Sequence, residues 1–272
     1  LFERLNRANL TLKASKTSLT TKTVMFLGNI VDKDGHRPDP IKIKAIEAIA
    51  LPQTAKKLQS ALGNLGYYRK FVKGYASKTH PLREKMASKW KKDKAGKAIW
   101  TDAERESFFE IRNILSKEPV LAHPDWTQPF EVHTDASQEG LGAVLVQRRA
   151  GREHAIMYAS RAITAAEQPF AIWELEALAV VWACRLFRMY LYGTRFKIIT
   201  DSQAVTTICK ASYKASGGRL ARWSMALNDF DYELVHRDGK RNAGPDLLSR
   251  NPIDNTQPYG EEPTEIDPHP IL

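Results

Sequence analysis

Residues 129–147 read PFEVHTDASQEGLGAVLVQ, an apolar, strand-like run that ends in one acid, Asp135, followed by small residues. Asp is common at strand ends, where its side chain caps the turn by accepting hydrogen bonds from nearby backbone N–H groups. Taken alone, the stretch favours that structural role. A chemical role for Asp135 requires that the fold bring other carboxylates to the same place.

Asp201 repeats the pattern, because KIITDSQAV (197–205) is an apolar run that ends in an Asp and continues into polar and small residues. Acids at the ends of neighbouring strands converge at one edge of a sheet, the edge where open α/β sheets usually bind ligands. Carboxylates held close together repel each other unless a cation neutralises them. Oxygen ligands suit Mg²⁺ or Mn²⁺, and two such ions can clamp a phosphodiester. Two strand-end caps remain the alternative.

Further acids lie on two predicted helices. WELEALAVVWA (173–183) is apolar except for Glu174 and Glu176. Burying an acid on the inner face of such a helix is costly unless a partner there pairs with it. Periodicity does not choose between the two. Asp246 opens the last predicted helix, GPDLLSR, where the helix dipole alone would favour an acid.

The order of elements predicts an α/β fold. Three strand-like runs after Phe130 are separated by turn residues, and a long apolar helix, a strand, two helices, a strand and a short helix follow. This order, βββαβααβα, indicates a mixed sheet with helices packed on it.

The part before residue 129 is different in character. A strand-like run occupies 23–31, and helical spacing with helix-start residues indicates a small helical unit over 40–86. Residues 91–128 are interpreted as a linker with one amphipathic helix, 102–118, which Thr101 could cap. Residues 252–272 contain five prolines, five acids and no Lys or Arg, and are expected to be a disordered tail.

Positive charge is concentrated in residues 65–97, which hold eleven Lys and Arg against Glu84 and Asp93. The formal charge of the whole chain is +10, so the remainder is nearly neutral. Aromatic residues interleave with these cations, a composition suited to a nucleic-acid backbone. A solvated helix face with its aromatics turned inward explains the composition equally well.

Bulk composition narrows the class of protein. A chain of 272 residues with 43% hydrophobic residues predicts two folded units. The sequence offers no apolar run long enough for a bilayer and no signal-peptide core at its start, so we expect no membrane partner and an intracellular, cytoplasmic or nuclear, protein that is not secreted. Cys184 and Cys209 have no CxxC partner and are expected to be small apolar residues.

Several ordered motifs resemble one family. TDAS and GLGAVL, ELEALAVVWA, FKIITDSQA and YELVHRDGKRNAGPDLLSR follow the order and spacing of the ribonuclease H domain of gypsy-type LTR retrotransposon reverse transcriptases. Upstream, FLGNIV, DPIKIKAI and LGNLGYYRKFVKGYASKTHPL resemble the thumb region of the same proteins. The resemblance covers residues 1–252. It implies the palm end and thumb-like region in 1–90, a connection in 91–128 and a ribonuclease H-like domain in 129–251.

The resemblance also implies a function. Asp135, Glu176, Asp201 and Asp246 match the family's four metal-binding carboxylates; Glu176 is preferred because a small residue, Ala179, follows three positions later. Two Mg²⁺ ions, or Mn²⁺, would activate a water and stabilise the leaving 3′ oxygen, cutting the RNA strand of an RNA/DNA hybrid. The thumb-like part would contact phosphates without reading sequence, through residues Tyr67, Tyr68, Arg69, Lys70, Lys73, Lys78 and Arg83.

Two departures from the family pattern stand out. Cellular ribonucleases H have a histidine in the loop before the fourth carboxylate, whereas this loop reads RDGKRNAG; gypsy-type domains commonly lack that histidine as well. SALGNLGYY stands where the family usually has a Phe before Leu-Gly.

Two rival functions follow from the same fold. A decayed element could leave a catalytically silent nucleic-acid-binding scaffold, but the presence of all four carboxylates argues against it. An integrase-type nuclease would need its glutamate after the second aspartate, whereas Glu176 precedes Asp201.

The polymerase of this family needs an Asp-Asp pair in its palm, and no such pair occurs in this chain. We therefore expect a fragment or truncated copy that does not polymerise by itself. Its expected partners are an RNA/DNA hybrid and the missing fingers and palm or other polyprotein products.

Overall fold

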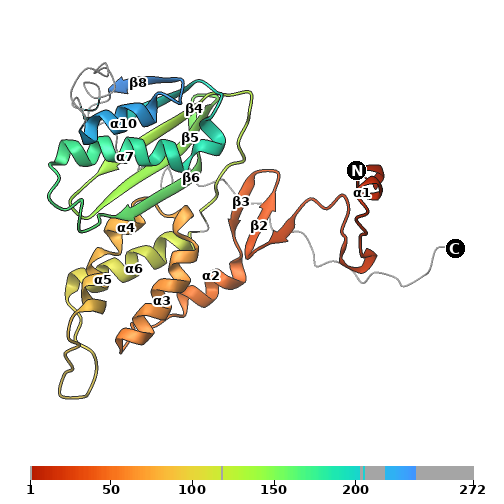
Figure 1. The fold of residues 1–272 in the computed structure, drawn as a ribbon. Helices are drawn as coiled ribbons and strands as arrows, with labels where there is room; N and C mark the ends of the chain where they lie inside the picture. The colour runs from red at the N-terminus through yellow and green to blue at the C-terminus, as the bar shows by residue number, and fades with distance from the viewer. Residues whose placement is uncertain (1, 118, 203–204, 206–217, 237–272) are drawn as a thin grey trace.

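The computed structural model describes residues 2–117, 119–202, 205 and 218–236. Its largest sheet has five strands in the order β6-β5-β4-β7-β8 (Figure 1). Their bounds are β4 (Phe130–Ala136), β5 (Gly140–Arg149), β6 (Arg152–Ala162), β7 (Phe196–Thr200) and β8 (Tyr232–His236). The first three form an antiparallel meander, whereas β7 runs parallel to β4 and β8 parallel to β7. The predicted mixed five-stranded sheet is confirmed.

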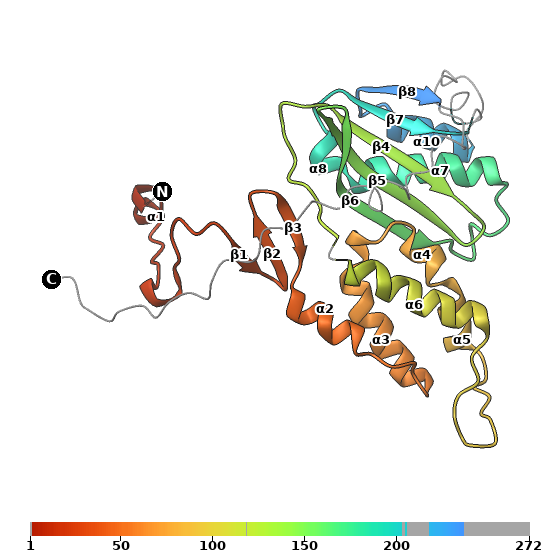
Figure 2. The same ribbon diagram turned by 180° about the vertical axis from the view of Figure 1, so that it is seen from behind.

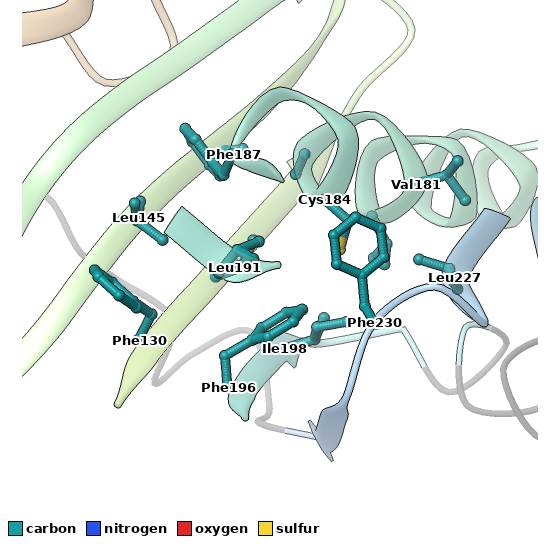
Figure 3. Close-up of a cluster of buried hydrophobic side chains, with 14 of the residues drawn as sticks. Phe130, Leu145, Val181, Cys184, Phe187, Leu191, Phe196, Ile198, Leu227 and Phe230 are labelled. Atoms are coloured by element: carbon teal, nitrogen blue, oxygen red, sulfur yellow. The ribbon is translucent and has the colours of Figure 1, made fainter. Parts of the chain in front are cut away.

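One face of this sheet is covered by α7 (Ile172–Leu186), α8 (Arg188–Leu191) and α10 (Arg219–Leu227). Phe130 and Val132 of β4 are buried on this face, in a cluster that also holds Cys184 and Phe187 (Figure 3). Because successive side chains of a strand point to opposite faces, Glu131, His133 and Asp135 lie on the other face. The apolar alternation of β4 therefore decides which way Asp135 points.

The other face carries a helical unit, seen from behind in Figure 2. It comprises α2 (Pro40–Glu47), α3 (Ala55–Tyr67), a 3₁₀ turn η2 (Arg69–Phe71), α4 (Tyr75–Lys78), α5 (His80–Ala87) and α6 (Asp102–Ser116). One apolar cluster joins Phe71 and Phe108 of this unit to Val144 and Tyr158 of the sheet. Helix α6, from the stretch interpreted as a linker, packs against α2 and α5, and Thr101 caps it as predicted.

The helical unit packs tightly against the sheet near Gly140. The Ala76 N–H of α4 donates to Ser160 Oγ of β6 at 2.9 Å, beside the start of β5. A Cβ on Gly140 would lie 2.8 Å from the Arg161 carbonyl oxygen and 3.3 Å from Ala76 Cβ. The absence of a side chain at Gly140 therefore lets α4 sit directly on the sheet.

The run 23–31, predicted as one strand, forms two: β1 (Val24–Phe26) and β2 (Asn29–Asp32). They turn at Leu27 and Gly28, with φ of 47° and 67°, as a two-residue hairpin of the type I′ kind requires. β3 (Gly35–Pro38) completes a small antiparallel sheet. The prediction missed the turn because apolar residues occupy both of its sides.

A short helix, α1 (Phe2–Arg7), and a 3₁₀ turn, η1 (Ala14–Lys16), precede this small sheet. Within the described ranges, the helices are too short or too polar to cross a bilayer. The helix predicted at 202–210, the final helix with Asp246, Cys209 and the tail 252–272 lie wholly or largely outside the described residues. The domain boundaries after residues 90, 128 and 251 stay predictions.

Candidate active site

Asp135 and Asp201 come from adjacent parallel strands. The ladder between β4 and β7 pairs Glu131 with Lys197 and His133 with Ile199. Asp135 and Asp201 each lie two residues beyond this last pair, one near the end of β4 and the other directly after β7. The fold therefore brings both strand-end acids to the same edge of the sheet.

Glu176 joins them from α7. The backbone N–H of Ala136 lies near its carboxylate and favours the charged form, and its Oε2 is buried without a partner among the described residues. Burial, with the charges of Asp201 and Asp135 added, raises the pKa of Glu176 to about 8. Glu176 therefore has an unpartnered oxygen within electrostatic range of two other acids, although the ligand atoms of the three do not all lie within 4.8 Å of one another. A cation between them would neutralise their charges.

Glu174 has a different role. Its carboxylate accepts the N–H of Ala171 at 3.0 Å, at the start of α7, and forms an ion pair with Arg219 of α10. The structure thus places Glu176 at the site and Glu174 in a link between two helices. Asp246, the fourth predicted ligand, lies outside the described residues.

The residues present fit a divalent metal ion. Three carboxylates supply only oxygen donors, the kind that Mg²⁺ and Mn²⁺ prefer, and one of these oxygens has no other partner. Burial and the charge of Asp201 raise the pKa of Asp135, whereas the Lys73 charge and the Ala136 N–H oppose that rise. A bound cation would remove the mutual repulsion.

Two further polar residues, Lys73 and His236, lie near the carboxylates Asp135 and Asp201. Lys73 of the helical unit is half-buried; burial lowers its pKa, and the charges of Asp135 and Glu153 oppose that shift. His236 ends β8, and its Nε2 lies 3.0 Å from the Asp201 carbonyl oxygen. Sequence reasoning missed His236, although its place at the end of a strand was a usable signal.

A second acidic cluster lies further along the same face of β4. Ligand atoms of Glu131, His133 and Glu153 lie within 4.8 Å of one another. The Arg148 guanidinium pairs with Glu131 at 2.9 Å and also with Glu153, so it supplies the countercharge. His133 and Arg148 hold the pKa of Glu131 at about 2 against the effect of burial. The cluster is an ion-pair network separate from the predicted carboxylates.

The predicted nucleic-acid-binding residues divide into two groups. Arg69 is exposed, Lys70 and Arg83 are half-buried, and Tyr67 is 52% exposed with its hydroxyl donating to the Leu27 carbonyl oxygen. The others have partners within the protein. Tyr68, 6% exposed, packs in the core beside Phe71, and Lys78 pairs with Glu110 of α6.

Comparison with known proteins shows what the chain is similar to. Residues 100–198 match the RNase H-like domain found in reverse transcriptase. It is similar to part of the retrovirus-related Pol polyproteins of Drosophila melanogaster transposons. Identity is 36% to that of opus (91% of this chain, 25% of that protein) and 34% to that of gypsy (92% and 24%). The resemblance inferred from the sequence motifs is thereby confirmed.

A more distant relative and a solved structure support the same similarity. The chain is 31% identical to the Tf2-3 polyprotein of Schizosaccharomyces pombe, with 96% of this chain and 19% of that protein covered. A foamy viral protease-reverse transcriptase has the same fold at 22% identity, with a TM-score of 0.64 over 94% of this chain and 33% of that one. The ribonuclease H-like α/β fold is thus confirmed. The chain spans about a quarter of the length of the curated relatives.

Proposed function

We propose that this chain is the ribonuclease H part of a retrotransposon reverse transcriptase and that it cuts the RNA strand of RNA/DNA hybrids with the help of divalent metal ions. The observation that carries the proposal is the convergence of Asp135, Asp201 and Glu176 at one edge of the sheet. Asp135 lies in β4, Asp201 directly follows β7, and Glu176 lies in the buried part of α7, so elements of the core position the three acids.

The roles of the residues follow from their placement. Asp135, Asp201 and Glu176, with Asp246 as the predicted fourth, would hold two Mg²⁺ ions, and Mn²⁺ suits the same donors. When bound, the ions supply a water nucleophile at neutral pH and stabilise the leaving 3′ oxygen. The nearby Ala136 N–H favours the charged form of Glu176, as a metal ligand requires. Lys73 adds positive charge beside Asp135, where a phosphodiester would lie.

The choice of substrate rests on the relatives. A foamy viral enzyme with the same fold is described in complex with an RNA/DNA hybrid, and another structure of that enzyme in complex with double-stranded DNA. We extend the hybrid to this chain, because the 2′-hydroxyl is what distinguishes the strand to be cut. We also propose that the chain associates with a separate palm and acts inside the cell.

The test is cleavage of a labelled RNA/DNA hybrid in Mg²⁺ and in EDTA, by wild type and by Asp201→Asn. We expect metal-dependent cutting that the substitution reduces at least about a hundredfold, since one ligand is lost. Asp231→Asn is the matched control, because Asp231 is an exposed acid just before β8. Tight hybrid binding by wild type without any cutting would contradict the nuclease and favour the silent scaffold.

A further inference from the structure

Helices α7 and α10 lie side by side over the sheet and are joined by an ion pair near each end (Figure 1). Arg219, the first residue of α10, pairs with Glu174 in the first turn of α7. Arg188, the first residue of α8, pairs at 3.4 Å with Asp229, shortly after α10. The pair at the start of the helices is the one near the carboxylate site, because Glu174 is two positions from Glu176.

The guanidinium of Arg219 is held by aromatic rings as well as by charge. Its central carbon lies 3.8 Å from the centroid of the Phe170 ring and 5.7 Å from that of the Trp223 ring. A planar guanidinium can stack on a ring and, at the same time, donate along its edge to a carboxylate. The stack on Phe170 fixes the direction of the group, so Glu174 meets a donor in a fixed position.

The segment that leads into α7 is fixed from its other side. Arg161 of β6 binds both carboxylate oxygens of Glu167, at 2.7 and 2.8 Å, and the Phe170 N–H donates to the Glu167 carbonyl oxygen at 3.0 Å. The ring of Phe170 then carries the guanidinium of Arg219. A continuous series of contacts therefore runs from the end of β6 through this segment to α10.

Glu174 connects this series of contacts to the first turn of α7. One of its oxygens accepts the Ala171 N–H at 3.0 Å, where the helix begins, and the other accepts from Arg219. Residues two positions apart on a helix lie about 200° apart around its axis, so Glu174 faces α10 while Glu176 faces β4. A rotation of α7 about its axis would move both side chains. The contact with Arg219 therefore restrains the direction of Glu176.

Stability alone does not explain an arginine at this position. Arg219 Nε is buried without a hydrogen-bond partner among the described residues, and a buried donor without a partner is unfavourable. An apolar side chain would pack on Phe170 and Trp223 without that cost. The feature that only a cation supplies here is the contact with the Glu174 carboxylate.

We propose that Arg219 is a positioning residue for the carboxylate site: acting through Glu174, it fixes the first turn of α7 and so the direction of the Glu176 carboxylate. The inference rests on the proposed function and deepens it, by naming a residue that holds a ligand in place without touching the metal. Ligands must be held within about 0.5 Å and about 10–20° of the productive geometry. Removing an outer partner of this kind typically changes metal affinity by about 10- to 100-fold.

The first test measures the Mg²⁺ concentration at the midpoint of metal-induced thermal stabilisation in the full chain, a readout that needs no catalysis. We expect Arg219→Gln to raise this midpoint about tenfold or more, because Glu176 is no longer held in place. Arg219→Lys keeps the ion pair and should stay within about threefold of wild type. The matched control, Arg188→Gln, breaks the ion pair at the other end of the same helices and should change the midpoint less than about twofold.

Melting temperatures in EDTA separate positioning from a purely structural role. Each glutamine variant loses one ion pair and a contact with an aromatic ring, so both should melt at a lower temperature than wild type. A merely structural Arg219 would show that loss of stability while its Mg²⁺ midpoint matched that of Arg188→Gln. This result would overturn the inference.

Glu174→Gln tests whether Arg219 acts through Glu174. The amide oxygen of glutamine can still accept the Ala171 N–H, but the charge that Arg219 holds is gone. We expect this variant, Arg219→Gln and the double variant to raise the Mg²⁺ midpoint by the same factor, because all three lose the same contact. Effects that multiply in the double variant would overturn the route through Glu174. Should Arg219→Gln not fold, Glu174→Gln decides alone, and an unchanged midpoint overturns the inference.

Cleavage of the labelled hybrid distinguishes positioning from direct contact with the substrate. In Mg²⁺ below saturation, Arg219→Gln should lower kcat about tenfold and leave KM within about twofold of wild type, since the side chain acts on α7. A raised KM at unchanged kcat would assign Arg219 to the nucleic acid and overturn the inference.

The outcomes for wild type separate this inference from the proposed function. If wild type neither gains stability from Mg²⁺ nor cuts the hybrid, the proposed function itself fails. If wild type does both, but Arg219→Gln behaves as Arg188→Gln does, only the positioning role of Arg219 is overturned.

Discussion

Lys73 of the helical unit and Asp135 of β4 act on each other electrostatically across the contact between the two parts of the protein. Burial raises the pKa of Asp135 and lowers that of Lys73, and each charge opposes the shift of the other. The two residues are 62 positions apart in the sequence. The helical unit is therefore part of the electrostatic environment of the carboxylate site.

Removing the positive charge of Lys73 should strengthen metal binding at the carboxylates. We expect Lys73→Met to lower the Mg²⁺ concentration at the midpoint of metal-induced thermal stabilisation by about two- to fivefold, because a nearby cation no longer repels the ion. Lys78→Met is the control, since Lys78 is paired with Glu110 instead. Equal midpoints for wild type and Lys73→Met would contradict the electrostatic link.

Glu176→Gln should stabilise the metal-free protein. Because the pKa of Glu176 rises from 4.5 to about 8 on folding, its contribution to the free energy of unfolding is full below pH 4.5 and is lost as pH rises towards 8. The variant avoids that loss, so its advantage should grow over this window to about 4 kcal/mol.

Urea unfolding in EDTA at pH 5 and pH 8 measures this difference. In saturating Mg²⁺, wild type should be more stable than Glu176→Gln, because only wild type keeps all the carboxylates that would bind the metal. A variant that is less stable than wild type in EDTA at pH 8 would show that Glu176 is not under charge repulsion.

Two glycines should respond in opposite directions to the same substitution. Gly140→Ala should destabilise by about 1–3 kcal/mol, because the new Cβ meets the Arg161 carbonyl and α4 must move. Gly63→Ala, inside α3 with nothing within 4 Å of its Cβ, should stabilise by about 0.5–1 kcal/mol. Thermal unfolding of both variants measures these changes in stability. A higher melting temperature for Gly140→Ala would mean that α4 does not pack tightly against the sheet.

Lys85 should matter for stability and not for nucleic-acid binding. It is 7% exposed, donates to Glu104 at 2.8 Å and to the Ile99 carbonyl oxygen at 2.7 Å, and lies over the Trp100 ring. Lys85→Met should cost about 3 kcal/mol, because Glu104 loses its buried partner. Adding Glu104→Gln should recover part of that loss in denaturant unfolding. A large drop in the salt slope of hybrid binding would contradict the structural role.

Much of the fold was predictable because short-range sequence patterns specify it. Alternating apolar residues fix which face of β4 is buried, and Thr101 marks the start of α6 with its own side chain. The turn at Leu27 and Gly28 escaped prediction, because backbone torsions with positive φ leave no hydrophobic signal when the flanking residues are all apolar.

Candidate site residues at strand ends could be named from the sequence, whereas the neighbours of the site could not. Asp135 and Asp201 were named because each ends an apolar strand, and their role as ligands stays a prediction. Residues of the basic segment could not be sorted by composition: Lys85 and Tyr68 are internal, whereas Arg69 and Arg83 line a cleft. Arg161 of that cleft carried no local signal, because it belongs to a strand far along the chain.

The sequence by itself determined the order of strands and helices, the family, and two acids at strand ends. Tertiary structure decided between Glu174 and Glu176, which lie two positions apart and so on different sides of one helix. Both have apolar neighbours, so no periodicity separates them. Only the packing of α7 against β4 and α10 directs Glu176 to the Ala136 N–H and Glu174 to Arg219, because those partners come from elements distant in the sequence.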